Sequence, residues 1–403
     1  MLDFTYYTPT KVVFGRNAET QTASLVREFG GRKLLIHYGG GSVVRSGLLQ
    51  RITDSLDAAG ISYVTLGGVV PNPRLSLVYK GIELCKTNHI DFILAVGGGS
   101  VIDSAKAIGY GVVNEGDVWD FYDYKRKAKG CLPVGVVLTI AATGSEMSAS
   151  SVITKEEGMI KRGYSSDFAR PKFAVMNPEL TMTLPDYQTA CGCTDILMHT
   201  MERYFNGSGT MEITDALAEG LLRTVMENAR ILVKNPKNYD ARAEIMWAGS
   251  LSHNGLTGCG SDGGDWATHK LEHEIGGLFD VAHGAGLAAI WGSWARYVYK
   301  DCLPRFVKFA VNVMGERRPD TQADGQPGST AADEALALRG IEDMEAFFRE
   351  IKMPTNLREL GVNATDEQLA EMAHKCAEGV GGCAGSAKKL REEDMLAIYR
   401  ASR

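Results

Sequence analysis

The stretch Phe92-Ile-Leu-Ala-Val-Gly-Gly-Gly-Ser-Val-Ile-Asp103 decides the fold expected of this 403-residue chain. Its first five residues are apolar and predict a buried strand, and the three glycines that follow predict a tight turn. A helical pattern then continues through Ile108, with Ser100 expected to cap the helix and Asp103 to complete a capping box. Strand, glycine turn and helix start together favour an anion site, because unpaired backbone NH groups and the helix dipole point at the turn. A plain tight turn is the alternative.

Similar apolar runs flank this stretch along the first half of the chain. Residues 33–37, 63–66 and 134–138 also predict buried strands, and residues 45–59 and 74–86 between them have the spacing of amphipathic helices. Strands that alternate with helices indicate crossover connections and a mostly parallel sheet. The first half is therefore expected to be an α/β domain.

The character of the sequence changes after Pro185. Six later stretches have helical spacing, and none alternates like a strand: 190–204, 211–232, 241–256, 287–299, 341–350 and 366–378. We therefore predict a dinucleotide-binding α/β domain over residues 1–185 and an all-helical, metal-binding domain over residues 186–403. The polar, Gly- and Pro-rich residues 317–330 are expected to form a surface loop.

Composition points to a small-molecule partner. Hydrophobic residues make up 44% of the chain, charged residues 23%, and the formal net charge is -6, which gives no electrostatic footprint for nucleic acid or an anionic membrane. No window is apolar enough for a membrane span, and the N-terminus does not resemble a signal peptide, so a cytoplasmic location is expected. The eight cysteines are expected to be reduced thiols.

Two further polar turns follow predicted strands. Gly39-Gly-Gly-Ser42 follows the strand at 33–37, and the turn after residue 138 carries the hydroxyls of Thr139, Thr143 and Ser145. Three such turns at strand ends favour one extended nucleotide ligand. Because the turn at Gly39 offers no carboxylate for the adenosine ribose, the sequence favours NADP(H), with NAD(H) possible.

Histidines indicate a metal site. His269 and His273 are spaced i and i+4 on a predicted helix that Gly276-Gly277 is expected to end, and His283 begins the next segment. An exposed histidine is the simpler alternative for His269. Lys270 occupies the position of the catalytic Glu in an HExxH protease motif, which counts against a zinc peptidase.

A second pair lies far upstream on another predicted helix. Asp195 and His199 are also spaced i and i+4, where the alternative is a hydrogen-bonded helical pair. One carboxylate and three imidazoles would suit Fe2+ or Zn2+.

Taken together, these motifs resemble the iron-containing (group III) alcohol dehydrogenase family over nearly the whole chain. The motifs are residues 97–103, 143–146, 177–185, Asp195 with His199, and His269 with His273 and His283. The DWATHxxxH stretch at 265–273 is similar to that of the butanol dehydrogenase and NADPH-dependent aldehyde reductase branch. The resemblance implies two domains, a metal in the cleft between them, and a homodimer.

The resemblance also implies roles for particular residues. Those matching metal ligands are Asp195, His199, His269 and His283, whereas His273 matches a position near the nicotinamide. Those matching cofactor contacts are Gly39, Gly40, Ser42, Asn72, Gly98, Gly99, Ser100, Asp103, Thr139, Thr143, Ser145 and Lys161. Ser148, the Cys-rich stretch at 191–195 and the length of the 317–330 loop depart from the family pattern.

The expected reaction is hydride transfer between the nucleotide and a primary alcohol or aldehyde such as butanol or butyraldehyde, at a Lewis-acidic metal. His273 is expected to relay the proton together with the ribose hydroxyls. The alternatives are a glycerol or polyol dehydrogenase of the same superfamily, a metal-dependent hydrolase, and a catalytically silent paralogue. Five apolar residues could line a substrate pocket or belong to the core: Phe121, Tyr122, Phe168, Leu278 and Phe279.

Overall fold

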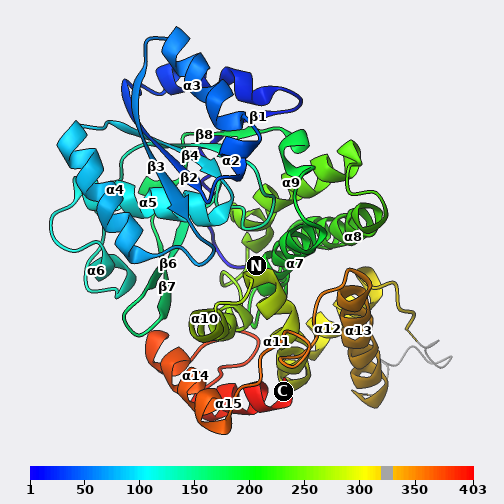
Figure 1. The fold of residues 1–403 in the computed structure, drawn as a ribbon. Coiled ribbons are helices and arrows are strands. Elements are labelled where there is room, and N and C mark those ends of the chain that lie inside the picture. Colours follow the sequence, from blue (N-terminus) through cyan, green and yellow to red (C-terminus); the bar gives the residue numbers. More distant parts are fainter. Residues whose placement is uncertain (319–329) are drawn as a thin grey trace. The chain divides into compact units, whose positions relative to one another are not determined.

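The computed structural model describes residues 1–318 and 330–403, so the expected loop at 317–330 lies almost wholly outside the described residues. The chain forms two compact units (Figure 1). The α/β unit comprises Tyr7–Pro185 and Lys237–Asn254, and the helical unit comprises Met1–Tyr6, Asp186–Pro236 and Gly255–Arg403. The assignment of nucleotide and metal binding to residues 1–185 and 186–403 stays a prediction.

A six-stranded sheet forms the centre of the α/β unit (Figure 1), in the order β1-β8-β5-β4-β2-β3. Its strands are β1 (Lys11–Phe14), β2 (Lys33–Gly39), β3 (Ser62–Val69), β4 (Phe92–Gly97), β5 (Val134–Leu138) and β8 (Phe173–Met176). All neighbouring strands are parallel, which confirms the expected sheet. The sequence did not predict β1 and β8, which have only four residues each, or the separate antiparallel hairpin of β6 (Ser150–Lys155) and β7 (Ile160–Ser165).

Helices cover both faces of this sheet. They are α1 (Thr22–Glu28), α2 (Ser42–Arg45), α3 (Leu48–Ala58), α4 (Leu75–Asn88), α5 (Gly99–Val113), α6 (Trp119–Tyr122) and α9 (Tyr239–His253). Successive strand residues point to opposite faces. Thus Ile93 packs with Val78 of α4 and Ile108 of α5, whereas Leu94 packs in the separate core that contains residues of α1 and α3. This alternation gives the doubly wound arrangement expected of a parallel sheet.

The helix α9 comes late in the sequence but belongs to the α/β unit. The hydroxyl of its Ser250 donates to the buried Glu146 carboxylate at 2.5 Å. Gly144 has a left-handed backbone (φ +63°), and a Cβ there would lie 2.5 Å from the carbonyl oxygen of Gly249. The turn after β5 is therefore held in place by a helix about 100 residues further along the chain.

The described part of the helical unit contains helices and no strand of a sheet. They are α7 (Asp186–Tyr204), α8 (Glu212–Lys234), α10 (Ala267–Phe279), α11 (His283–Val298), α12 (Leu303–Asn312), α13 (Thr330–Glu350), α14 (Asp366–Gly379) and α15 (Glu392–Ala401). The expectation that Gly276-Gly277 ends a helix is wrong. Both glycines are buried inside α10, which ends at Phe279 and is followed by Asp280 in a left-handed conformation (φ +51°). Packing of the helix overrides the weak helix propensity of glycine. No helix in the described ranges is long and apolar enough to cross a membrane.

A fully buried histidine ties the sheet to α5. The Nδ1 of His37, in β2, lies 2.8 Å from the Leu66 carbonyl oxygen, and its Nε2 lies 2.8 Å from the Ser104 hydroxyl of α5. Since a carbonyl only accepts, Nδ1 carries the proton and Nε2 accepts from Ser104. Burial lowers the pKa of His37 to about 4, although the bond to Leu66 opposes the shift.

The lowered pKa of His37 predicts that the protein loses stability in acid. The unfolded chain binds a proton near pH 6.5 but folded His37 does not until about pH 4, so its contribution is complete above pH 6.5 and is lost as the pH falls. Between pH 7.5 and 5.0 the free energy of unfolding of the wild type should fall by about 2 kcal/mol more than that of His37→Gln. Urea unfolding of the metal-free proteins at both pH values measures this difference. Equal pH dependence in the two proteins would contradict it.

Candidate functional site

Three turns lie along one edge of the sheet. The strands β5, β4 and β2 are adjacent and parallel, so their carboxyl ends share an edge. Most of the residues predicted to contact a nucleotide lie at or just after the carboxyl ends of these strands and of the adjacent strand β3: Gly39, Gly40, Ser42, Asn72, Gly98, Gly99, Ser100, Thr139 and Thr143. Ligands of open α/β sheets bind in the crevice outside the carboxyl ends of the strands.

The glycines after β4 let two of these turns touch. A Cβ on Gly99 would lie 2.3 Å from Cγ2 of Thr143, and a Cβ on Gly98 would lie 3.0 Å from the Ile140 side chain. Gly98 is the residue that precedes α5, and no side chain caps this helix, so the expected Ser100 capping box is wrong. Ser100 lies in the first turn of α5, and Asp103 bonds elsewhere.

Asp103 and Lys106 of α5 organise the third turn from inside the protein. The Asp103 carboxylate accepts from the Ser145 hydroxyl (2.6 Å) and from the backbone NH of Val152 (2.9 Å). The fully buried Nζ of Lys106 lies 2.7–3.0 Å from four oxygens, the Ser145 carbonyl and hydroxyl and the carbonyls of Ser148 and Ser150. Burial lowers the pKa of Lys106 to about 8, opposed by the nearby carboxylates.

Sequence reasoning included Ser145 and Asp103 but missed Lys106. The available signal was a lysine within the apolar helix pattern of residues 101–113. Lys161, also predicted to contact the nucleotide, is buried in β7 opposite Thr154 of β6. The backbone NH of Thr154 donates to the carbonyl of Pro73, next to Asn72, whose φ is +53°. Thr154 therefore links the neighbourhoods of Asn72 and Lys161.

In the helical unit, three helices bring the four predicted metal ligands together. Asp195 and His199 lie on α7, His269 on α10, and His283 is the first residue of α11. The Asp195 Oδ1 lies 3.2 Å from His199 Nδ1, 3.8 Å from His269 Nε2 and 3.7 Å from His283 Nε2. Potential ligand atoms of Asp195, His199 and His269 all lie within 4.8 Å of one another.

The electrostatics of this cluster fit a divalent cation. Burial opposes ionisation of Asp195, but the surrounding imidazoles outweigh it and keep the pKa of the carboxyl below its usual range. Burial lowers the pKa of His199. Burial also acts to lower the pKa of His269, but contacts with Asp195 and Glu202 outweigh burial and raise this pKa to about 9. The buried Asp195 Oδ1 and His269 Nε2 make no hydrogen bond. Nitrogen and carboxylate donors of this kind suit Fe2+ or Zn2+.

Two carboxylates that the sequence reasoning missed lie behind the histidines. Glu202 Oε1 accepts from His269 Nδ1 at 2.7 Å and from its backbone NH at 2.9 Å. Glu272 Oε2 bonds to His283 Nδ1. The signal was spacing, since each Glu comes three residues after a predicted ligand, His199 or His269.

Small residues let α11 approach its neighbours. A Cβ on Gly284 would lie 2.1 Å from the backbone oxygen of Cys191 in α7. A Cβ on Gly286 would lie 2.9 Å from Cγ of Glu272 in α10. Both glycines are in the first turn of α11, next to His283. Close packing there places His283 beside Asp195.

Asp265 and Trp266 directly precede α10, the helix of His269. Trp266 has a left-handed backbone (φ +62°), and its ring centroid lies 5.4 Å from that of His269 and 6.1 Å from that of His199. The Arg203 guanidinium lies 4.6 Å from the centroid of the Trp266 ring. Asp265 accepts from the backbone NH groups of Ala267, Ser386 and Ala387, which fixes the start of α10.

His273, the predicted catalytic residue, lies one turn after His269. It is 7% exposed, and its ring centroid is 6.0 Å from that of His283. Of the apolar residues that were pocket or core candidates, Phe121 and Tyr122 are in the core of the α/β unit and Phe168 is 53% exposed.

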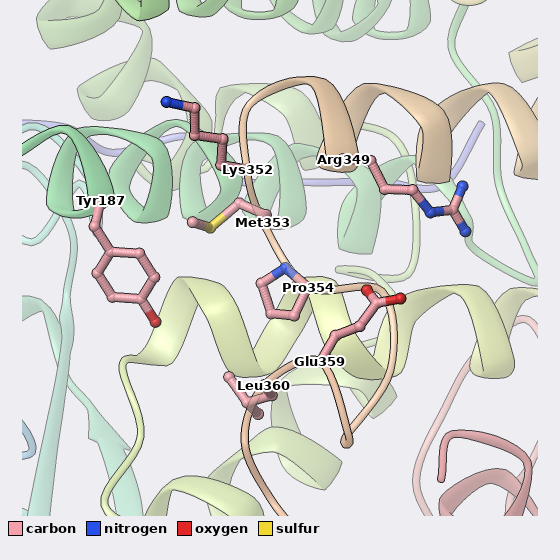
Figure 2. Close-up of a pocket in the computed structure, with 7 residues that line it drawn as sticks. All are labelled: Tyr187, Arg349, Lys352, Met353, Pro354, Glu359 and Leu360. Atoms are coloured by element: carbon pink, nitrogen blue, oxygen red, sulfur yellow. The ribbon is translucent and has the colours of Figure 1, made fainter.

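A hollow of about 530 Å³ lies elsewhere in the helical unit. Figure 2 shows its lining: Tyr187, Arg349, Lys352, Met353, Pro354, Glu359 and Leu360. None of these residues was predicted to bind nucleotide or metal, and their mixed charges specify no one class of ligand.

Comparisons with known proteins cover almost the whole chain. A family profile described as "Iron-containing alcohol dehydrogenase" matches residues 9–178, and one described as "Fe-containing alcohol dehydrogenase family, C-terminal" matches residues 189–403. The chain is 40% identical to a probable NADH-dependent butanol dehydrogenase of Bacillus subtilis (strain 168), over 100% of both chains.

Two further relatives have names that specify different nucleotides, NADPH for one and NADH for the other. The chain is 33% identical to an NADPH-dependent aldehyde reductase of Escherichia coli (strain K12), over 91% of both chains. Its fold matches the crystal structure of an NADH-dependent butanol dehydrogenase A from Thermotoga maritima with a TM-score of 0.93 and 36% identity, over 99% of this chain and 98% of the other.

The contact between α7 and α11 gives a prediction. Gly284→Ala should push α11 away from Cys191, lower the free energy of unfolding by about 1–3 kcal/mol and reduce bound divalent metal. Gly220→Ala in α8 is the control, because its added methyl meets nothing within 4 Å. Thermal unfolding and metal analysis of both variants are the measurements. Wild-type metal content in Gly284→Ala would show that this contact does not position His283.

Proposed function

This chain belongs to the iron-containing alcohol dehydrogenase family, and on that premise we propose that it transfers hydride between NADP(H) and a primary alcohol or aldehyde such as butanol or butyraldehyde. The observation that carries the proposal is the cluster of the buried Asp195 with three imidazoles. We assign nucleotide binding to residues 1–185 and metal binding to residues 186–403. By the same resemblance we propose a cytoplasmic homodimer.

The proposed ligands of a divalent ion, Fe2+ or Zn2+, are Asp195, His199, His269 and His283. When bound, the ion supplies Lewis acidity to the substrate oxygen, and the nicotinamide supplies or accepts the hydride. The protein's own contribution at this point is to hold one carboxylate and three imidazoles together on three separate helices, with Asp195, His199 and His269 buried and His283 partly exposed. The rings of Trp266 and His199 lie beside His269, with their centroids 5.4 and 4.6 Å from that of its ring.

The proposed nucleotide contacts lie along the turns of the α/β unit and around Lys161. They are Gly39, Gly40, Ser42, Asn72, Gly98, Gly99, Ser100, Asp103, Thr139, Thr143, Ser145 and Lys161. Two features support NADP(H) over NAD(H). A Cβ on Gly40 would meet nothing within 4 Å, and the Arg45 guanidinium lies near Gly41. Open space and a cation at the end of β2 would suit the 2′-phosphate of NADP(H). NAD(H) is the alternative, because a relative is named as NADH-dependent.

An anaerobic assay of the Fe2+-loaded enzyme tests the proposal. We expect oxidation of NADPH with short to medium aldehydes and a preference over NADH that Arg45→Ala reduces. His283→Ala should lose bound metal and activity together, whereas His374→Ala, an exposed histidine of α14, should keep both. Full activity without metal would contradict the metal centre, and a preference for NADH would contradict the nucleotide assignment.

His273 is proposed to move the proton that the substrate oxygen gains or loses, with the ribose hydroxyls as a relay. His273→Ala should lower kcat by about 100-fold or more and change its pH profile, because a positioned acid or base contributes that much. Bound metal should stay at the wild-type level, since His273 is not a proposed ligand. Unchanged turnover and an unchanged pH profile would remove His273 from the mechanism.

A further inference from the structure

Two buried carboxylates lie behind the proposed metal ligands. Glu202 is 2% exposed and Glu272 is 0% exposed. Each bonds to the Nδ1 of a different histidine, Glu202 to His269 and Glu272 to His283. They reach these rings from different helices, α7 and α10. The two contacts are therefore separate instances of the same arrangement.

These bonds determine which ring nitrogen is available at the cluster. A carboxylate only accepts, so Nδ1 of His269 and of His283 carries the proton. In the neutral form of each ring, Nε2 then presents its lone pair on the side of Asp195, whose Oδ1 lies 3.8 Å from His269 Nε2 and 3.7 Å from His283 Nε2. Both rings are thus oriented and in the tautomer that binds a cation through Nε2.

We propose that Glu202 and Glu272 are positioning residues for the divalent cation: each fixes the tautomer and orientation of one histidine ligand and makes that imidazole a stronger donor. This inference rests on the metal site of the proposed function. It adds two residues to that site, and each acts through a ligand.

Charge supports the same conclusion. With Asp195, the two glutamates bring three carboxylates to one buried cluster. Burying charge is costly unless it is paired, and imidazoles that bind a cation through Nε2 are neutral and provide no net positive charge of their own. A dication offsets most of the negative charge that Asp195, Glu202 and Glu272 bring to the interior.

A glycine in the first turn of α11 leaves room for the Glu272 side chain. Glycine favours a helix less than alanine does. Gly286 nevertheless occupies the first turn of α11, where a Cβ would lie 2.9 Å from Cγ and 3.0 Å from Oε1 of Glu272. The space that a methyl would fill is used by the carboxylate that bonds to His283.

Metal affinity tests this inference directly. Zn2+ and Co2+ affinities of the purified full chain are measured by competition with a chelating dye, with the visible spectrum of bound Co2+ as a second readout. We expect Glu202→Gln and Glu272→Gln to weaken binding by about 10–100-fold and to shift the Co2+ bands. Glu272→Ala should weaken binding more than Glu272→Gln, because glutamine keeps an acceptor oxygen. Gly286→Ala should weaken it without changing any ligand or glutamate.

Glu219→Gln is the matched control. Glu219 is a buried carboxylate of α8 that accepts from the Tyr204 hydroxyl, and the variant should bind metal as the wild type does. If the wild type binds neither cation, the metal centre of the proposed function fails. A second outcome would overturn this inference alone. In that outcome the wild type binds the cations, His283→Ala does not, and both glutamine variants keep the affinity and the Co2+ spectrum of the wild type. The two glutamates are on different helices, so a folding defect in one variant leaves the other as the test.

Discussion

The arrangement of the helical unit depends on the burial of one carboxylate, Asp195, beside three imidazoles. A carboxylate in the interior is unfavourable unless positive charge or hydrogen bonds compensate for it. The imidazoles keep the pKa of Asp195 low, and three helices must converge to supply them. The packing of α7, α10 and α11 therefore brings polar partners to this carboxylate as well as burying apolar side chains. This is the physical reason to regard the cluster as a cation site.

Convergence of that kind requires backbones to come close. Gly284 lets α11 rest on the backbone of Cys191, and Gly286 leaves room for Glu272. In the α/β unit, Gly99 does the same for Thr143, and Gly144 for the carbonyl of Gly249. In each case the glycine lies within a few residues of a predicted ligand or nucleotide contact. Glycines at these sites are thus explained by packing between segments as well as by access for a phosphate.

The α/β unit also contains buried charge, used in a different way. Lys106 is fully buried and lies within hydrogen-bond distance of four oxygens of the segment after β5. An ammonium has three protons, so it shares them among these oxygens. It joins Ser145, Ser148 and Ser150, which lie in the turn after β5 and at the start of β6. A rigid loop beside Gly99 keeps the proposed nucleotide contacts in place, which limits the entropy lost when a ligand binds.

Local patterns in the sequence determined much of this protein. Apolar runs identified β2, β3, β4 and β5, and the i and i+4 spacing of Asp195 with His199 and of His269 with His273 put each pair on one helix. Such signals are readable because neighbours in a helix or strand share a face. The tertiary structure alone decided the rest. It placed α9 beside the turn at Gly144, continued α10 through Gly276-Gly277, and joined Glu202 to His269 across 67 residues of sequence. These contacts depend on the packing of distant segments, which no local spacing encodes.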